Sequence, residues 1–228
     1  RRERRIPAVA DAARVLVGAA LAGGAYLLAR GDSPGVVQTN LFRLINELPG
    51  GAASFFVGLT QLGSLGAVLV AAVVAATRRR LVFARCLLAA GGGAWVLSKL
   101  IQLAAHLEPP DMVVPHVVLR GATAASAGFP AVHAAVAAAM ATVVGAHLSR
   151  SARRLAWIGD GGVGLARIYV GAHLPVDAVG GIGIGWAAGA IAIVIFGLRR
   201  GRPTLDTLEA QLPTLLGAPI QRICTTGD

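Results

Sequence analysis

The chain alternates between long apolar runs and short polar or basic segments. Runs near the ~20 residues that cross a ~30 Å hydrocarbon core predict transmembrane helices, because backbone groups in lipid must bond within their own segment. We therefore predict an all-α, polytopic membrane protein with a six-transmembrane-helix bundle. The expected spans are about Val15–Ala29, Ala52–Ala76, Leu81–Ala105, Pro130–Leu148, Leu155–Val170 and Val176–Leu198.

Two smaller patterns refine this bundle. Gly181, Gly185 and Gly189 recur every fourth residue, which lets a neighbouring backbone approach the last span. Between the first two spans, Ser33 is expected to cap a short amphipathic helix that Pro34 opens. This helix either lies on the outer membrane surface or packs over the bundle. Its apolar stripe consists of Val37, Leu41, Leu44, Ile45 and Leu48.

Composition supports the membrane interpretation. Hydrophobic residues make up 55% of the 228 residues and charged residues only 14%, whereas soluble domains carry about 25% charged residues. The net charge is +10, but the basic residues form short clusters between apolar runs, which argues against a nucleic-acid partner. The Ala-, Gly- and Arg-rich composition is typical of a bacterial cell-envelope protein with a GC-rich gene.

The basic clusters also predict orientation. Sixteen of the 21 Lys and Arg residues fall on one side of the six predicted spans, which the positive-inside rule makes cytoplasmic. Both termini are then cytoplasmic. We divide the chain into a basic cytoplasmic N-terminus (1–14), a six-helix membrane domain (15–198) and a cytoplasmic tail (199–228). The tail is expected to begin a further domain, fused or separate, and the sequence leaves oligomerisation open.

Ionisable residues at the ends of the spans converge on the extracytoplasmic side. Because charged groups in a membrane are costly, they indicate function. His173 and Asp177 are four residues apart, a spacing that brings side chains together on a helix, and His106 lies two helical turns after Lys99. The full set is Lys99, His106, His133, Arg167, His173 and Asp177.

These residue types suit phosphoryl transfer. Cations neutralise phosphate oxygens, a His paired with Asp can act as a nucleophile, and a second His can protonate the leaving oxygen. A histidine metal site is less favoured, because Asp177 is the only carboxylate that joins the cluster. For Lys99 the structural alternative is snorkelling to the membrane surface, and for His106 a structural role is equally plausible.

Three segments resemble the signatures of the type 2 phosphatidic acid phosphatase superfamily. Residues 167–177, RIYVGAHLPVD, resemble the third signature, Ser-Arg, five residues, His, three residues, Asp. Residues 130–133, PAVH, resemble the second, Pro-Ser-Gly-His. Lys99 followed by His106-Leu107 resembles the first, Lys, six residues, Arg-Pro.

The resemblance implies a metal-independent and cofactor-independent phosphatase whose partner is a lipid phosphate or an isoprenoid (pyro)phosphate. It implies that His173 attacks phosphorus and forms a phosphohistidine, that Asp177 orients His173, and that His133 protonates the leaving oxygen. It further implies that Lys99 and Arg167 hold the phosphoryl oxygens at the extracytoplasmic face.

Several positions depart from the family pattern. His106 replaces an Arg, Ala131 a Ser and Val132 a Gly, so part of the phosphate cradle is altered. Arg120, in the loop before the second signature, is a hypothetical replacement for the missing cation. One alternative is therefore a catalytically lapsed module that binds an anionic lipid headgroup. A transporter component is a third option, although no inverted repeat supports it.

Overall fold

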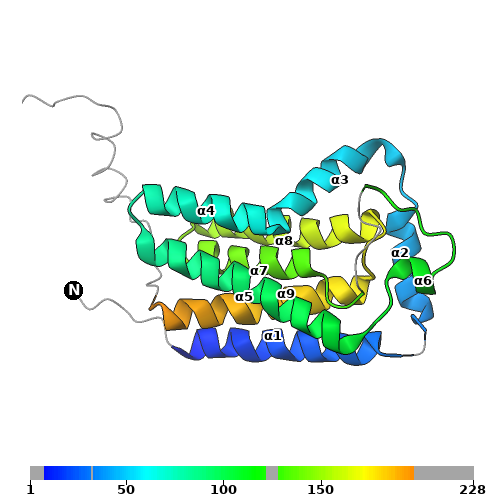
Figure 1. Ribbon diagram of the computed structural model, residues 1–228, viewed down its shortest axis with the longest axis horizontal. Coiled ribbons are helices and arrows are strands. Elements are labelled where there is room, and N and C mark those ends of the chain that lie inside the picture. The colour runs from blue at the N-terminus through cyan, green and yellow to red at the C-terminus, as the bar shows by residue number, and fades with distance from the viewer. Residues whose placement is uncertain (1–7, 32, 122–127, 198–228) are drawn as a thin grey trace, which may run out of the picture.

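The computed structural model describes residues 8–31, 33–121 and 128–197, and all regular structure in these ranges is helical. Long helices lie side by side along one axis, and α2 and α6 lie together at one end (Figure 1). Residues 1–7 and the tail 199–228 lie outside the described residues, whereas residues 8–14 of the predicted N-terminal region form the start of the first helix. The division of the chain into these regions stays a prediction. The elements are α1 (Ala8–Ala29), α2 (Val36–Asn46), η1 (Gly50–Ala52), α3 (Ala53–Thr60), η2 (Gln61–Gly63), α4 (Leu65–Thr77), α5 (Leu81–Ala105), α6 (Pro110–Val113), α7 (Val132–Gly145), α8 (Arg150–Tyr169) and α9 (Pro175–Ile195).

The core of the bundle is α7, which packs against α5, α8 and α9. Most of its residues are buried, and their small alanine side chains allow three neighbouring helices to approach. At 14 residues it is about 21 Å long, shorter than a ~30 Å hydrocarbon core. The residues that precede it, Phe129, Pro130 and Ala131, are also buried, so α7 begins inside the bundle.

The predicted glycine stripe of the last span is confirmed. A Cβ atom on Gly181 would overlap the Ala131 carbonyl oxygen, and one on Gly185 would overlap the Ala135 carbonyl oxygen. On Gly189 it would lie 3.0 Å from the carbonyl oxygen of Ala139. α9 therefore packs its backbone directly on α7 and on the loop before it, which fixes the start of α7 against the start of α9.

The second predicted span is not one continuous helix. It is broken at η2, and the two parts, Gly50–Gly63 and Leu65–Thr77, are bent by 59°. Ser64 begins a new helix at the break, because its Oγ accepts the N–H of Ala67 at 3.1 Å. The departure of α3 from the axis of the bundle is visible in Figure 1.

A bundle of six spans is not confirmed. Within the described residues, three helical stretches are long and apolar enough to cross a membrane, and the bent pair makes a fourth if it is one span. The three are Ala10–Ala29, Leu81–Val113 and Pro175–Ile195. α7 is too short by this measure, and α8 carries several charged residues. Large apolar side chains on the outer faces of these helices, such as Leu16, Val70 and Ile195, are exposed, as expected of a membrane protein.

The amphipathic helix between the first two spans exists, but it begins later than predicted. α2 starts at Val36 after Gly35, and not after Ser33. One face packs on the bundle through buried Phe42 and Asn46, and the Asn46 amide donates to the carbonyl oxygens of Val118 and Tyr169. The opposite face exposes most of the predicted apolar stripe, namely Val37, Leu41, Leu44 and Leu48.

Candidate active site

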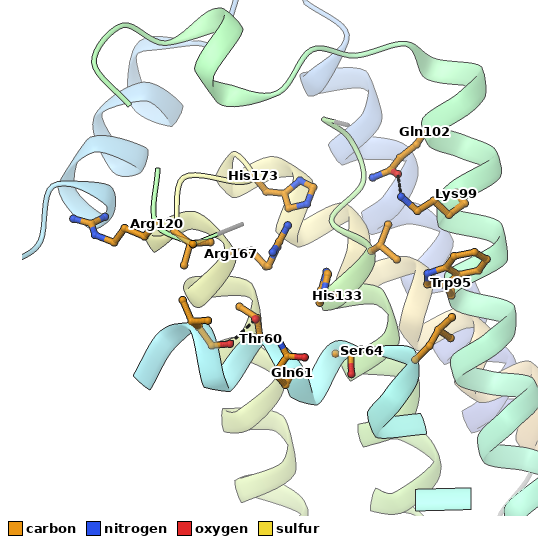
Figure 2. A pocket seen from close by; sticks show the side chains of 16 residues that line it. Thr60, Gln61, Ser64, Trp95, Lys99, Gln102, Arg120, His133, Arg167 and His173 are labelled. Atoms are coloured by element: carbon orange, nitrogen blue, oxygen red, sulfur yellow. Dashed lines mark hydrogen bonds between the residues drawn. The ribbon is translucent and has the colours of Figure 1, made fainter. Parts of the chain in front are cut away.

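A cavity of about 500 Å³ lies where the break between α3 and α4 faces the start of α7 and the end of α8. Figure 2 shows Arg167 between His173 and His133, with Lys99 and Gln102 reaching in from α5. Five of the seven predicted site residues line this cavity, and they come from separate parts of the chain. The predicted residues that line it are Lys99, Arg120, His133, Arg167 and His173.

His173 lies in the tight turn between α8 and α9. Gly171 gives this turn its shape with φ of +82°, a conformation that L side chains rarely adopt, and a Cβ there would lie 2.8 Å from the Val118 carbonyl oxygen. The backbone N–H groups of Ala172 and His173 both donate to the Arg167 carbonyl oxygen. The turn therefore ties the positions of His173 and Arg167 together.

Asp177 lies behind His173, in the first turn of α9. Its Oδ2 accepts the N–H of Leu174 at 2.8 Å and lies 3.7 Å from Nδ1 of His173. The second distance is too long for a hydrogen bond, but it fits a charge interaction. Asp177 thus closes the turn and faces the nitrogen of His173 that an orienting carboxylate would contact.

The environment of His173 favours the neutral ring. The side chain is 2% exposed, and this burial lowers its pKa below the usual histidine value. The nearby Arg167 lowers the pKa further, whereas Asp177 opposes the shift. A neutral imidazole near pH 7 has a nitrogen lone pair that can attack an electrophile.

Arg167 has no counterion among the residues that the structure describes. The residue is 6% exposed, and its Nε has no hydrogen-bonding partner among the described residues. Removing an unpaired charge from water is costly, so a buried guanidinium indicates a place where an anion binds. No Asp or Glu is present among the described residues that line the cavity. The cavity is therefore electropositive and suited to an anionic ligand.

Lys99 and His133 face the cavity from two other helices. Lys99 Nζ donates to Gln102 Oε1 at 3.0 Å, and Gln102 Nε2 donates to the Pro130 carbonyl oxygen at 2.9 Å. Gln102 thereby holds Lys99 next to the loop that leads into α7. His133 is the second residue of α7 and lines the cavity beside Val132.

Arg120 lines the cavity but is held by backbone carbonyls. Its guanidinium donates to the carbonyl oxygens of Asn46, Tyr169 and Leu48 at 2.6–2.8 Å, and it lies 4.2 Å from the centroid of the Tyr169 ring. In Figure 2 the guanidinium is directed away from the other labelled cations. These contacts join α2, the 114–121 loop and α8, so Arg120 has a structural function in this arrangement.

His106 does not share a helical face with Lys99, contrary to the prediction. α5 ends at Ala105, and His106 turns away with a left-handed φ of +50°. It lines a second, smaller hollow of about 250 Å³ together with Glu108 and Asp177. The prediction placed His106 by extending the helical spacing one residue beyond the predicted end of the span at Ala105, whereas the backbone changes direction at that residue.

Five polar or aromatic residues that complete the cavity were not predicted from the sequence. Thr60, Gln61 and Ser64 come from the break between α3 and α4, and Trp95 and Gln102 come from α5. A signal was present, because Gln61-Leu62-Gly63-Ser64 puts two polar residues and a glycine inside an apolar run. Ser before Leu65 is also typical of a helix N-cap.

The fold and the site define a helical membrane protein with a cavity that Lys99, Arg120 and Arg167 line together with two histidines. Comparison with known proteins places the chain in a family. The model of the PAP2 superfamily matches residues 83–200, which is just over half of the chain. The chain belongs to the PAP2 superfamily, as the sequence signatures predicted.

One solved structure is similar in fold. The crystal structure of Aquifex aeolicus LpxE superposes with a TM-score of 0.65 at 23% sequence identity, and the match covers 72% of this chain and 98% of that one. No curated protein sequence matches the chain significantly. Membership of the superfamily supports a lipid phosphatase, and the geometry of the cavity is the basis for a more specific proposal.

Proposed function

We propose that this protein hydrolyses a lipid phosphate or an isoprenoid (pyro)phosphate at the extracytoplasmic face of the membrane. One observation carries the proposal: within the described part of the chain, Arg167 is buried without a counterion in a cavity that His173, His133 and Lys99 also line. A phosphate group supplies the missing anion, and its phosphorus would then lie within reach of a histidine side chain. The outer face is supported by the arginine clusters in the sequence.

The proposed reaction has two displacements. A ring nitrogen of His173 attacks phosphorus while the bond to the lipid oxygen breaks, and His133 donates a proton to that oxygen. Asp177 stabilises the positive charge that develops on His173, and Arg167 and Lys99 stabilise the equatorial oxygens. Water, deprotonated by His133, then attacks the phosphohistidine, which releases phosphate and restores the neutral ring.

A second candidate, a lapsed phosphatase that binds an anionic headgroup, is favoured by Val132. This residue lines the cavity next to His133, at the position where the family signature has Gly. The neighbouring Ala131 lacks the hydroxyl of the signature Ser. The double variant Ala131→Ser, Val132→Gly separates the two functions, since a large gain in turnover indicates a weakened enzyme and no gain indicates a binding module.

Phosphate release from a panel of lipid phosphates and isoprenyl pyrophosphates, with chelator present, tests the proposal. Wild-type protein is expected to release phosphate, and His173→Asn is expected to lose activity because Asn cannot form the covalent intermediate. His116→Asn is the matched control, because His116 lies exposed in the outer loop. Equal rates for wild type and His173→Asn would refute the mechanism.

A further inference from the structure

The wall of the cavity formed by the break between α3 and α4 is polar but uncharged. Thr60, Gln61 and Ser64 lie across from Arg167 and His133 (Figure 2). These three side chains bring an amide and two hydroxyls, which offer both donors and acceptors. This segment lies outside the superfamily match, which begins at residue 83.

The hydrogen-bonding capacity of this wall is only partly used within the protein. The Gln61 amide has no hydrogen-bonding partner among the described residues. Thr60 Oγ1 donates to the Val57 carbonyl oxygen at 2.7 Å and keeps lone pairs that can accept. Ser64 Oγ accepts the N–H of Ala67 and keeps its own proton to donate. Unused donors and acceptors therefore face the cavity.

The chemistry of this wall discriminates between possible neighbours of the phosphate. A hydrocarbon chain against it would cover these polar groups without satisfying their hydrogen bonds, which is unfavourable. The three residues of the break include no Lys, Arg or His that could neutralise a second phosphate. Hydroxyl groups match the mixed donors and acceptors without adding charge.

The size of the cavity and the position of Trp95 support the same ligand. Ligand cavities of about 300–1,000 Å³ hold drug-sized molecules, so about 500 Å³ accommodates more than a phosphate group. Trp95, which lines the cavity from α5, offers an apolar ring surface beside the polar wall. A sugar or polyol presents C–H groups as well as hydroxyls and can contact both.

We infer that Thr60, Gln61, Ser64 and Trp95 form a subsite for a hydroxylated group, a sugar or polyol, that carries the phosphate. The inference rests on the proposed function, because it assumes that phosphate occupies the cationic side of the cavity. Gln61 is then a residue that determines specificity. The hydroxylated group belongs either to a lipid headgroup or to a free sugar phosphate.

Binding of non-hydrolysable phosphonates in detergent micelles tests this subsite independently of turnover. The probes are dodecyl phosphonate and the phosphonate analogues of dodecyl glucoside 6-phosphate and methyl glucoside 6-phosphate. Wild-type protein is expected to bind the dodecyl glucoside probe about tenfold more tightly than dodecyl phosphonate. This difference corresponds to about two additional hydrogen bonds. Gln61→Leu is expected to reduce this preference to about twofold, because one donor–acceptor group is lost.

Leu62→Ala is the matched control, because Leu62 belongs to the same break but is 55% exposed and does not line the cavity. It should keep the wild-type preference. If the methyl glucoside phosphonate binds more weakly than the dodecyl glucoside phosphonate, the ligand is lipid-linked. If the two bind equally, the ligand is a free sugar phosphate.

Equal wild-type affinities for dodecyl phosphonate and the dodecyl glucoside probe would overturn the inference but not the proposed function. So would a Gln61→Leu variant that weakens both probes equally, because the residue would then act on the cavity as a whole. If the wild type binds no phosphonate, both the subsite and the phosphate site are refuted. A preference for the glucoside probe without hydrolysis of any ester would keep the subsite and refute the enzyme.

Discussion

The wall of the cavity that carries His133, Arg167 and His173 is fixed by contacts between three elements, whereas the opposite wall is a break within one stretch of helix. On the first wall, the Ala131 N–H donates to the Asp177 carbonyl oxygen at 3.0 Å, which joins the loop before α7 to α9. On the second wall, the hydrogen bonds of Thr60 and Ser64 stay within a few residues.

This difference indicates that one wall carries out the reaction and the other recognises the rest of the ligand. Reactive groups must keep their mutual geometry, and tight backbone packing provides it. Groups that recognise the rest of the ligand can lie on irregular backbone, which presents polar atoms that a continuous helix would bond internally. The predictions below test this division, from the largest expected effect to the smallest.

Removing the unpaired cation should have the largest effect. Arg167→Ala is expected to lower kcat/KM by about 10²–10³-fold, as removal of one preorganised donor typically does. The thermal midpoint of this variant should not fall, because the substitution removes a buried charge for which the described residues offer no counterion. Steady-state kinetics and thermal unfolding in detergent check both parts. Arg154→Ala, on the exposed face of α8, is the control, and a comparable loss of activity there would contradict the assignment.

Coupling between the two walls depends on Gly63. A Cβ on this residue would overlap the backbone of His133, so Gly63→Ala must push the break away from α7. We expect about a tenfold loss of kcat/KM, because small displacements of catalytic groups reduce turnover strongly. In Gly58→Ala the new Cβ meets nothing within 4 Å, so activity should be kept. Unchanged activity in Gly63→Ala would show that the walls act independently.

Arg120 should affect stability and not chemistry. Arg120→Ala removes the donor to three carbonyl oxygens, and we expect a loss of about 1–3 kcal/mol of unfolding free energy. The specific activity of the folded protein should change less than threefold. Arg30→Ala, at an exposed position, should change neither quantity. A selective rise in KM with wild-type stability would instead make Arg120 the replacement cation of the sequence hypothesis.

The smallest expected effect is a pH dependence of stability. The pKa of His173 is lowered in the folded protein, so below about pH 6.5 the unfolded chain binds more protons. His173 therefore contributes stability above that pH, which is lost as the pH falls. Between pH 7.5 and 5.5 the thermal midpoint of wild type should fall by a few degrees more than that of His173→Gln. Parallel curves for the two proteins would contradict a buried neutral ring.

The sequence allowed the cationic wall to be predicted but not the uncharged one. The spacing of Arg167, His173 and Asp177 is a local property that survives any error in helix bounds, and the glycine repeat of α9 fixed which face packs closely. α5 was predicted with its observed bounds, Leu81–Ala105. The sequence pattern identified both Arg167 and Arg120 as candidate phosphate-binding cations. Only the structure distinguishes them, because Arg120 donates to backbone carbonyl oxygens, whereas Arg167 Nε has no hydrogen-bonding partner among the described residues.

The break between α3 and α4 could not be seen in averaged hydropathy. Gln61 and Ser64 are short interruptions in an apolar run, and a window of about 20 residues smooths them out. Likewise, helical periodicity does not anticipate the left-handed turn at His106, which moves His106 off the face of Lys99. Irregular backbone is decided by tertiary packing, such as that of Gly63 on His133.

The central claim, that His173 forms a covalent bond to phosphorus, is tested most directly by single-turnover trapping. The protein is mixed with a lipid phosphate that it hydrolyses, and the reaction is quenched within milliseconds in alkali, which preserves phosphohistidine. The peptides are then mapped by mass spectrometry. The account predicts a phosphoryl group on His173, absent from His173→Asn, which also fails to turn over. A phosphoryl group on another residue, or turnover by His173→Asn at the wild-type rate, would contradict it.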